Sequence, residues 1–224
     1  MVYVYAVDIA NLPDPLETPE IMENLPESRK QKILKSKRPE ARKQSLGAGL
    51  LLGGILKQRG FSDLQIGFGP NGKPEVEGIF FNLSHSKTMV ICAVGEKSVG
   101  CDIEQISKAP GKVADRFFNE RELRYLNQIP EEKRNKEFYR LWTMKESYIK
   151  MTGEGMQLPL DKFEVDFEEG IQIYREGEKQ NCFVREYQLS QGEQLQYLIS
   201  VCSEEEKFVK QIIFKKWEEL VDKK

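Results

Sequence analysis

The sequence is poor in cysteine and histidine and has no long apolar run. Its four cysteines, at positions 92, 101, 182 and 202, form no C-x-x-C pair. This spacing argues against a zinc site or a disulfide framework, and each cysteine is better interpreted as a small apolar residue of a strand. No stretch approaches the roughly 20 apolar residues that span a bilayer. His85 is the only histidine, and no Gly-x-Ser-x-Gly motif accompanies it, which argues against a serine-hydrolase triad.

A surplus of positive charge is also absent. The chain carries 34 Lys and Arg against 36 Asp and Glu, a net charge of -2. Generic nucleic-acid binding rests on an excess of basic residues that meet phosphates, so this balance does not favour it. The first ten residues reach Asp8 before they could form the apolar stretch of a signal peptide, and they lack a basic leader. We therefore expect a cytoplasmic protein with neither nucleic acid nor a membrane as its partner.

The chain has enough apolar material for a proper core, since 39% of its 224 residues are hydrophobic. Periodicity and turn residues predict the same order of elements twice, a strand followed by helices and then strands. The expected strands are 2–9, 64–68, 80–83, 89–95, 98–103, 162–167, 171–174, 183–187 and 195–202, with a further strand at 209–214 left open; the expected helices are 26–37, 39–59, 112–118, 120–127, 132–152 and a short one at 217–221. This order predicts an α+β fold of two similar subdomains, residues 1–97 and 98–224, with the ligand site between them.

Two acidic residues of the expected strand 98–103 and its continuation form the first candidate site. Alternation along a strand puts Asp102 and Glu104 on one face, about 7 Å apart, and Cys101 and Ile103 on the other. Such carboxylates repel each other unless protons or a cation intervene, and carboxylate oxygens are ligands that Mg²⁺ prefers. Taken alone, the pattern is more typical of the solvated edge of an amphipathic strand than of a metal site.

A charged helix face forms the second candidate site. Trp142, Lys145, Glu146, Ile149 and Lys150 follow the spacing i, i+3, i+4, i+7, i+8, so we expect them on one face of the long helix. One interpretation is an exposed i,i+4 ion pair beside a core tryptophan. The other is that Glu146 is a third metal-binding carboxylate and Lys150 a cation that faces a phosphate.

Three polar segments complete the candidates. Asn82, Ser84, His85 and Ser86 are expected just after a strand, where their side chains and free backbone amides would suit a phosphate. Residues 72–74, Gly-Lys-Pro, are a turn on any interpretation. Residues 29–43 are dense in Lys and Arg, which is typical of a solvated face and also of a site for a small polyanion.

Taken together, four of these segments resemble one family, the surfactin-type (Sfp-type) 4'-phosphopantetheinyl transferases. Gly72-Lys73-Pro74, Phe81-Asn82-Leu83-Ser84-His85-Ser86, Val99-Gly100-Cys101-Asp102-Ile103-Glu104 and the segment from Phe138 to Lys150 occur in the order of the family's motifs. The similarity runs from the first strand to about Cys202, and four ordered motifs are far more specific than any one of them.

The resemblance implies a monomeric pseudo-dimer of two α+β halves with its active site in the cleft between them. It implies a transferase of the holo-[acyl-carrier-protein] synthase type, which moves the phosphopantetheine arm of coenzyme A to a serine of an apo acyl or peptidyl carrier protein and releases adenosine 3',5'-bisphosphate.

By resemblance, each candidate residue also acquires a role. Those that would hold Mg²⁺ with the coenzyme A pyrophosphate are Asp102, Glu104 and Glu146. Those that would contact coenzyme A itself are Lys43 at the nucleotide phosphates, Lys73 and Pro74 at the adenine, Ser84 and His85 at the 3'-phosphate, Lys145 in the cleft wall with Trp142, and Lys150 at the pyrophosphate. The catalytic pair would be Glu146, as general base directly or through water, and Lys150, which would assist departure of the bisphosphate.

The chain departs from the family in the basic helix. The family's 3'-phosphate lysines correspond to Ser28 and Gln31 here, so the candidate replacements are Arg29, Lys30 and Lys32. Two other functions use many of the same residues, a non-catalytic coenzyme A-binding module and a magnesium-dependent phosphohydrolase. Glu146 and Lys150 argue against the first, because a protein that only binds coenzyme A needs no general base.

Overall fold

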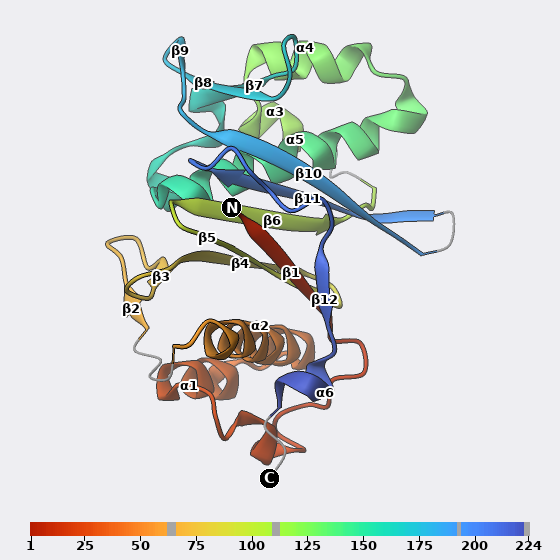
Figure 1. The fold of residues 1–224 in the computed structure, drawn as a ribbon. Helices are drawn as coiled ribbons and strands as arrows, with labels where there is room; N and C mark the ends of the chain where they lie inside the picture. The colour runs from red at the N-terminus through yellow and green to blue at the C-terminus, as the bar shows by residue number, and fades with distance from the viewer. Residues whose placement is uncertain (62–65, 109–112, 192–193, 222–224) are drawn as a thin grey trace.

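The computed structural model describes residues 1–61, 66–108, 113–191 and 194–221 (Figure 1). In chain order the elements are β1 (Tyr3–Asp8), η1 (Pro19–Met22), α1 (Glu27–Lys35), α2 (Pro39–Gln58), β2 (Gly67–Phe68), β3 (Pro74–Glu75), β4 (Phe80–Ser86), β5 (Met89–Gly95), β6 (Val99–Gln105), α3 (Val113–Phe117), α4 (Glu120–Gln128), α5 (Glu131–Thr152), η2 (Gly155–Gln157), η3 (Leu160–Lys162), β7 (Phe163–Asp166), β8 (Gln172–Arg175), β9 (Glu178–Lys179), β10 (Phe183–Gln191), β11 (Gln194–Ser203), β12 (Ile213–Lys215) and α6 (Trp217–Leu220). The mixture of sheets and helices confirms the predicted α+β class.

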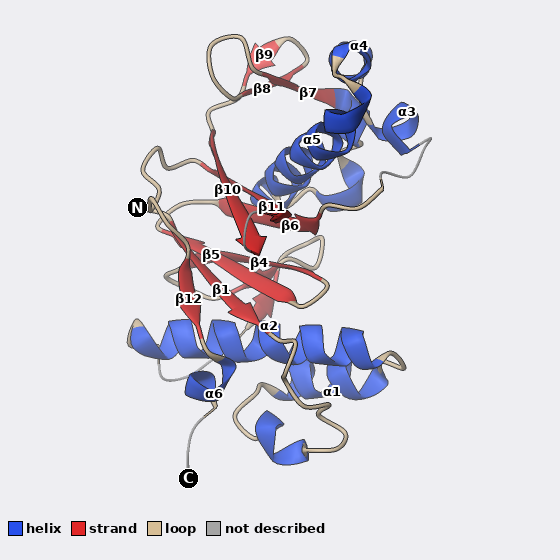
Figure 2. Cartoon of the chain, turned by 90° about the vertical axis from the view of Figure 1, so that its right-hand side faces the viewer, coloured by secondary structure: helices blue, strands red, loops and turns tan. Residues whose placement is uncertain are grey.

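Two sheets lie face to face in the middle of the molecule, and each is covered by helices on its outer side (Figure 2). The first sheet has the strand order β12-β1-β5-β4 and the second β10-β11-β6. Helix α2 covers the outer face of the first sheet, with α1 beside it, and α5 covers the outer face of the second. Two shorter hairpin-like sheets, β2-β3 and β7-β8-β9, lie at the periphery.

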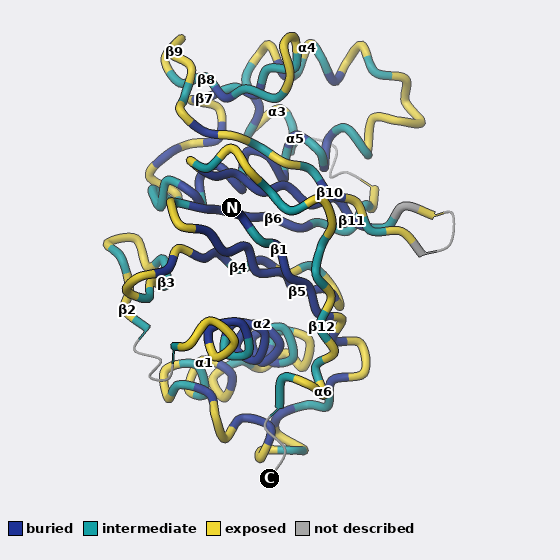
Figure 3. The backbone as a smooth tube through the Cα atoms, in the orientation of Figure 1, coloured by how far each residue is buried: buried dark blue, intermediate teal, exposed yellow. Residues whose placement is uncertain are grey.

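The core between the sheets follows from alternation along their strands. On β1, Val4 and Ala6 point to the second sheet, whereas Tyr5 and Val7 point to α2. Because both faces of the first sheet are covered, its central strand β5 is buried along its whole length. The burial pattern in Figure 3 agrees, with buried backbone through the two sheets and exposed backbone in the outer loops.

Strands β4 and β6 join the two sheets through side chains. The backbone amide of Cys101 donates to Asn82 Oδ1, and the amide of Gln105 donates to Ser86 Oγ. The constant offset of 19 residues shows that the two strands run in the same direction. These polar side chains take the place of the carbonyls that a neighbouring strand would offer.

The strand that holds His85 is longer than predicted. We expected it to end at Leu83, with the serines and His85 beyond it, but β4 continues to Ser86 and pairs antiparallel with β5 through Ser86 and Met89. The ladder with β5 takes up the backbone groups on one side of β4, so fewer backbone amides are free at this point than we expected.

The predicted subdomain boundary at residue 97 falls between β5 and β6, where the chain passes from one sheet to the other. The C-terminal segment nevertheless returns to the first sheet, since β12 pairs in parallel with β1 and α6 packs on α2. The expected strand and helix at 209–221 are both present, though shorter. Part of the expected strand at 64–68 and the start of the expected helix at 112–118 lie outside the described residues.

Candidate active site and phosphate pocket

Asp102 and Glu104 lie on the outer face of β6, toward α5, as alternation predicts. Asp102 is 4% exposed and its Oδ1 accepts a hydrogen bond of 2.9 Å from Ser84 Oγ. Glu104 Oε2 accepts one of 3.0 Å from Ser86 Oγ. Each carboxylate of β6 is thus matched by a serine of β4, which shows what the hydroxyl groups next to His85 do in this structure.

Lys150 comes from the last turn of α5 and closes over the same cluster. Its Nζ lies 2.6 Å from Asp102 Oδ1 and 3.2 Å from Ser84 Oγ. Burial alone would lower the pKa of Lys150, but its ion pair with Asp102 outweighs burial and raises it. The ammonium therefore stays charged at neutral pH and supplies a fixed positive charge at the centre of the site.

Electrostatics places Glu146 in the same cluster. Burial raises the pKa of Glu146 and the negative charge of Asp102 raises it further, while Lys150 opposes both. The pKa of Glu104 is also raised, first by burial, then by Asp102 and by Glu146, against the hydrogen bond from Ser86 and the charge of Lys150. Asp102 thus raises the pKa values of both glutamates, and perturbed carboxyl groups of this kind are a feature of functional sites.

One atom of the cluster is positioned to bind a cation. Asp102 Oδ2 is buried and has no hydrogen-bond partner among the described residues. An unpartnered carboxylate oxygen is costly to bury, and a hard cation such as Mg²⁺ would satisfy it. In the described part of the chain no three His, Cys, Asp or Glu side chains form a ready metal cluster. The fit to a metal therefore rests on the unpartnered Asp102 Oδ2 alone.

Gly100 allows α5 to approach this closely. A Cβ built on Gly100 would clash with the Ser147 carbonyl oxygen and the Met151 amide nitrogen of the helix. With glycine at this position the backbones of β6 and α5 touch. That contact brings Lys150, next to Met151, to Asp102, two residues beyond Gly100.

A separate pocket of about 410 Å³ lies between α1, α2, β4 and the β2–β3 hairpin. Its polar and charged lining residues are Ser28, Arg29, Lys32, Ser36, Gln44, Ser45, Asn82 and His85. Burial lowers the pKa values of both Arg29 and Lys32, and the positive charge of Arg29 lowers the pKa of Lys32 further. Two crowded, partly desolvated cations are the environment in which an anion such as phosphate is stabilised. We therefore call this cavity the phosphate pocket.

His85 connects this pocket with the acidic cluster. Burial lowers its pKa, and the positive charges of Lys150 and Lys32 lower it further, against a weaker opposing effect from Asp102. The imidazole is therefore neutral at physiological pH and lies within electrostatic reach of the cations of both sites. Ser84 belongs to the acidic cluster instead, because its hydroxyl group is held by Asp102 and Lys150.

The structure distinguishes among the basic candidates of α1. Arg29 and Lys32 line the pocket, whereas Lys30 Nζ donates to the Glu23 carbonyl, 3.0 Å away, outside it. Lys43 is not among the lining residues of the pocket. Its charge acts on Asp14, the ion-pair partner of Arg42. The nucleotide contact expected of Lys43 stays a prediction.

Lys145 does not share the active face of α5. It is fully buried, with Nζ 2.6 Å from Glu122 Oε1 and 2.7 Å from the Phe163 carbonyl oxygen. Residues five positions apart differ by about 140° around a helix, so Lys145 and Lys150 emerge on different sides. The expectation that Lys145 lines the cleft is wrong because α4 and β7 enclose it. Trp142 packs against Phe117 and Phe138 in an aromatic cluster.

Lys73 and Pro74 belong to the β2–β3 hairpin but have different surroundings. Pro74 lines the phosphate pocket, as does Gly72. The Lys73 ammonium instead donates to three backbone carbonyls on the other side of the hairpin. The adenine contact predicted for Lys73 is therefore not open to its ammonium in this structure.

Two pocket residues on α2 were missed by sequence reasoning. Ser45 Oγ is buried without a hydrogen-bond partner among the described residues, and it lines the phosphate pocket beside Gln44. Together with Ala41 and Ala48 these residues follow the spacing i, i+3, i+4, i+7. This stripe of small and polar residues on a helix with an otherwise apolar face was the signal that could have found them.

Comparison with known proteins agrees with this geometry. Residues 98–202, which include β6 and α5, match the model of the 4'-phosphopantetheinyl transferase superfamily. The chain is 33% identical to a 4'-phosphopantetheinyl transferase of Bacillus subtilis, over 79% of this chain and 80% of that protein. It is 33% identical to the transferase Sfp of B. subtilis strain 168, over 71% and 72%. It is 40% identical to the transferase gsp of Aneurinibacillus migulanus, over 59% of this chain and only 55% of gsp.

The chain belongs to the 4'-phosphopantetheinyl transferase superfamily, and it is a transferase of this class. The matches to the two B. subtilis proteins each extend over more than two thirds of both chains. The resemblance noted from four motifs is thus confirmed.

Proposed function

We propose that this protein transfers the 4'-phosphopantetheine arm of coenzyme A to a serine of an apo acyl or peptidyl carrier protein and releases adenosine 3',5'-bisphosphate. One observation carries the proposal beyond the family assignment. The three mutually repelling acids and Lys150 lie next to a pocket that gathers Arg29, Lys32 and His85. A donor with one phosphate group at its ribose and a pyrophosphate a few bonds away matches this pair of neighbouring sites.

The phosphate pocket would hold the nucleotide end of the donor. Arg29 and Lys32 replace the lysines that the family carries one position earlier, and with His85 they would bind the 3'-phosphate. Pro74 and Gly72 would lie against the adenine. The hydroxyl group of Ser45 would donate to a phosphate oxygen, which would satisfy its buried and unpartnered Oγ.

The acidic cluster would carry the chemistry. The carrier serine oxygen attacks the β-phosphorus of coenzyme A, a P–O bond to that phosphorus forms, and the bond to the bridging oxygen breaks. Glu146 accepts the serine proton, since its raised pKa keeps it closer to neutral pH than an exposed glutamate. Lys150 stabilises the charge that develops on the departing bisphosphate.

Asp102, Glu104 and Glu146 would hold Mg²⁺ in this site. The buried, unpartnered Asp102 Oδ2 is the structural reason for including Asp102. When bound, the ion would neutralise pyrophosphate charge and hold the donor in line for attack.

We also propose how the two halves of the molecule are related and where the protein acts. The two stacked sheets would be the halves of a pseudo-dimer, with the substrates bound where β4 meets β6 and α5. We propose that the protein acts as a cytoplasmic monomer. None of the described helices is long and apolar enough to cross a membrane.

The function is tested by incubating the purified protein with coenzyme A, Mg²⁺ and a panel of apo carrier proteins, with mass spectrometry of the carriers and assay of the released bisphosphate. We expect release only when a carrier is present, together with modification of that carrier. Release without a carrier would indicate a phosphohydrolase, and binding of coenzyme A without release would indicate a non-catalytic module. Glu146→Gln and Asp102→Ala should abolish transfer and retain the fold, and wild-type rates in either variant would remove the metal assignment.

A further inference from the structure

The β2–β3 hairpin is tied to the end of α5 by the ammonium of Lys73. Nζ lies 2.7 Å from the carbonyl oxygen of Lys150 and 3.2 Å from that of Met151, in the last turn of the helix. A third hydrogen bond, of 3.1 Å, goes to the carbonyl oxygen of Val99, at the start of β6. All three protons of the ammonium therefore have backbone acceptors.

This contact satisfies carbonyls that the helix itself leaves free. The last four carbonyls of an α-helix have no partner inside the helix, and a cation at this end is favoured by the helix dipole. Ile149 O is taken by the amide of Gly153, at 3.0 Å. Lys73, which lies 77 residues earlier in the chain than Lys150, satisfies the next two. Burial lowers the pKa of Lys73, whereas the three carbonyl oxygens that accept its hydrogen bonds stabilise the charged ammonium.

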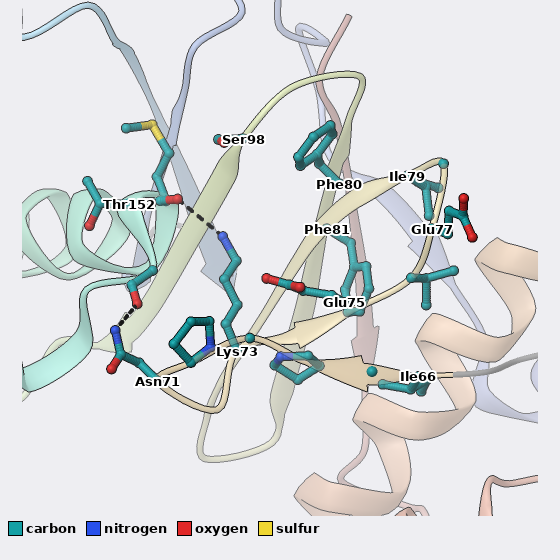
Figure 4. A pocket seen from close by; sticks show the side chains of 18 of the residues that line it. Ile66, Asn71, Lys73, Glu75, Glu77, Ile79, Phe80, Phe81, Ser98 and Thr152 are labelled. Atoms are coloured by element: carbon teal, nitrogen blue, oxygen red, sulfur yellow. Dashed lines mark hydrogen bonds between the residues drawn. The ribbon is translucent and has the colours of Figure 1, made fainter.

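A second side chain of the hairpin makes a parallel link. Asn71 Nδ2 donates to the carbonyl oxygen of Gly153 over 2.9 Å, and Asn71 Oδ1 accepts from Gln157 Nε2, also over 2.9 Å. Figure 4 shows the Lys73 and Asn71 side chains both extending from the hairpin turn toward the end of α5. They cross one side of a cavity of about 900 Å³ that is lined by the hairpin, the start of β4, Ser98 and the end of α5.

The three elements that Lys73 joins carry different parts of the site. The hairpin lines the phosphate pocket with Gly72 and Pro74. Strand β6 carries Asp102, three residues after Val99, and α5 carries Lys150, whose own carbonyl oxygen accepts the shortest of the three bonds. One half-buried ammonium therefore links the hairpin to the acid-bearing strand and the lysine-bearing helix.

We propose that Lys73 is a positioning residue, which holds the end of α5 against β6 and the hairpin so that Lys150 and Asp102 keep the geometry needed for transfer. The inference rests on the proposed function for its kinetic consequence, but the structural link itself does not. It differs from a role in nucleotide binding, because a positioning residue affects the chemical step and a nucleotide contact affects affinity for the donor.

The kinetic test compares Lys73→Met, which keeps the aliphatic stem and removes the cation, with Lys179→Met, an exposed lysine on β9. We expect kcat to fall between about tenfold and a hundredfold in Lys73→Met, because small displacements of catalytic groups have effects of this size. The KM for coenzyme A should change less than about threefold, as uniform binding is retained. Lys179→Met should behave as wild type. A raised KM with unchanged kcat would overturn the proposal in favour of a nucleotide contact.

A second measurement does not depend on turnover. Hydrogen exchange of the unliganded proteins should be faster in Lys73→Met at the end of α5 and at the start of β6, with the rest of α5 unchanged. Asn71→Ala, a milder change in the same hairpin, should speed exchange near Gly153 only. Unchanged exchange in Lys73→Met would overturn the proposal even if transfer is confirmed. If the wild type failed to transfer, the proposed function would fall, and this measurement would still decide the structural link.

Discussion

Arg29, Lys32 and Lys30 provide a matched set at the scale of single residues. They share one helix and one charge, but the first two line the phosphate pocket and the third faces Glu23. A charge-assisted hydrogen bond contributes about 1.5–3 kcal/mol. The loss of either pocket cation should therefore raise the KM for coenzyme A by about tenfold or more.

The prediction is specific for the 3'-phosphate. Steady-state kinetics of Arg29→Ala and Lys32→Ala should show a much smaller increase in KM with dephospho-coenzyme A, which lacks that group, and Lys30→Ala should resemble wild type with both donors. Equal effects on the two donors would place these cations on the pyrophosphate instead. His85→Ala is expected to follow the same pattern.

His85 should take up a proton when the nucleotide binds. Its pKa in the free protein is lowered by burial and by Lys150 and Lys32, so the imidazole is neutral near pH 7. A bound phosphate group adds negative charge beside it and raises the pKa. Calorimetry of adenosine 3',5'-bisphosphate binding in buffers of different ionisation enthalpy should therefore show net proton uptake near neutral pH.

The control for this measurement is His85→Gln, which keeps hydrogen-bonding capacity but does not titrate. Its binding enthalpy should depend much less on the buffer. If wild type and His85→Gln take up the same number of protons, another group titrates and the phosphate lies away from His85.

The chemistry of single residues was partly predictable from sequence. The acids of β6 were found because alternation along a strand depends only on local geometry. Lys145 and Lys150 were wrongly placed on one face of α5. They are five residues apart, so their side chains differ by about 140° around the helix axis, and they contact different neighbours, Glu122 and Asp102. Lys73 was placed in a turn correctly, yet what its side chain contacts depends on a helix end 77 residues away. Local patterns do not contain that information.

At the scale of elements, the close contact between β6 and α5 depends on Gly100. Gly100→Ala would place a methyl group against backbone atoms of Ser147 and Met151, which no change of side-chain rotamer relieves. Overpacking of this kind costs about 1–3 kcal/mol, or a decrease in Tm of about 2–4 °C per kcal/mol for a chain of this length. We also expect at least tenfold lower transfer activity, because α5 carries Lys150 away from Asp102.

Gly53→Ala is the matched control for this substitution. Gly53 lies inside α2, and a Cβ there would meet nothing within 4 Å. Alanine should stabilise the helix by about 0.5–1 kcal/mol, with unchanged activity. Thermal unfolding and transfer rates of the two variants together test the contact, and unimpaired activity in Gly100→Ala would show that the approach of α5 does not set the catalytic geometry.

Element order was predicted more accurately than the pairing of elements. Helix α5 and strand β5 follow from long apolar or amphipathic patterns, and both were expected within one residue of their observed limits. That β4 reaches Ser86 depends on pairing with β5, and that β12 joins β1 depends on a contact across almost the whole chain. Polar residues at 84–86 argue against a strand locally, and the tertiary structure overrides that preference.

At the scale of the whole molecule, the acidic cluster should make stability depend on pH in an unusual direction. The pKa values of Glu104 and Glu146 are raised in the folded state by burial and by Asp102, whereas both are ordinary in the unfolded chain. The folded state therefore binds protons more tightly, and the contribution of these groups to stability falls as pH rises through their folded pKa values. The acidic cluster is therefore a source of electrostatic repulsion in the free protein at neutral and alkaline pH.

Glu146→Gln should therefore raise Tm above that of wild type at alkaline pH, with a gain that disappears at acidic pH, where Glu146 is protonated in both states. Mg²⁺ should stabilise wild type at alkaline pH and stabilise Glu146→Gln less, because a cation offsets the repulsion that the substitution removes. Glu178→Gln, at an exposed position on β9, controls for the loss of one negative charge from the whole chain. Thermal unfolding of wild type, Glu146→Gln and Glu178→Gln across pH, with and without Mg²⁺, measures these effects. A lower Tm for Glu146→Gln at alkaline pH would show that the Glu146 carboxylate stabilises the cluster, and the repulsion on which this prediction rests would then be wrong.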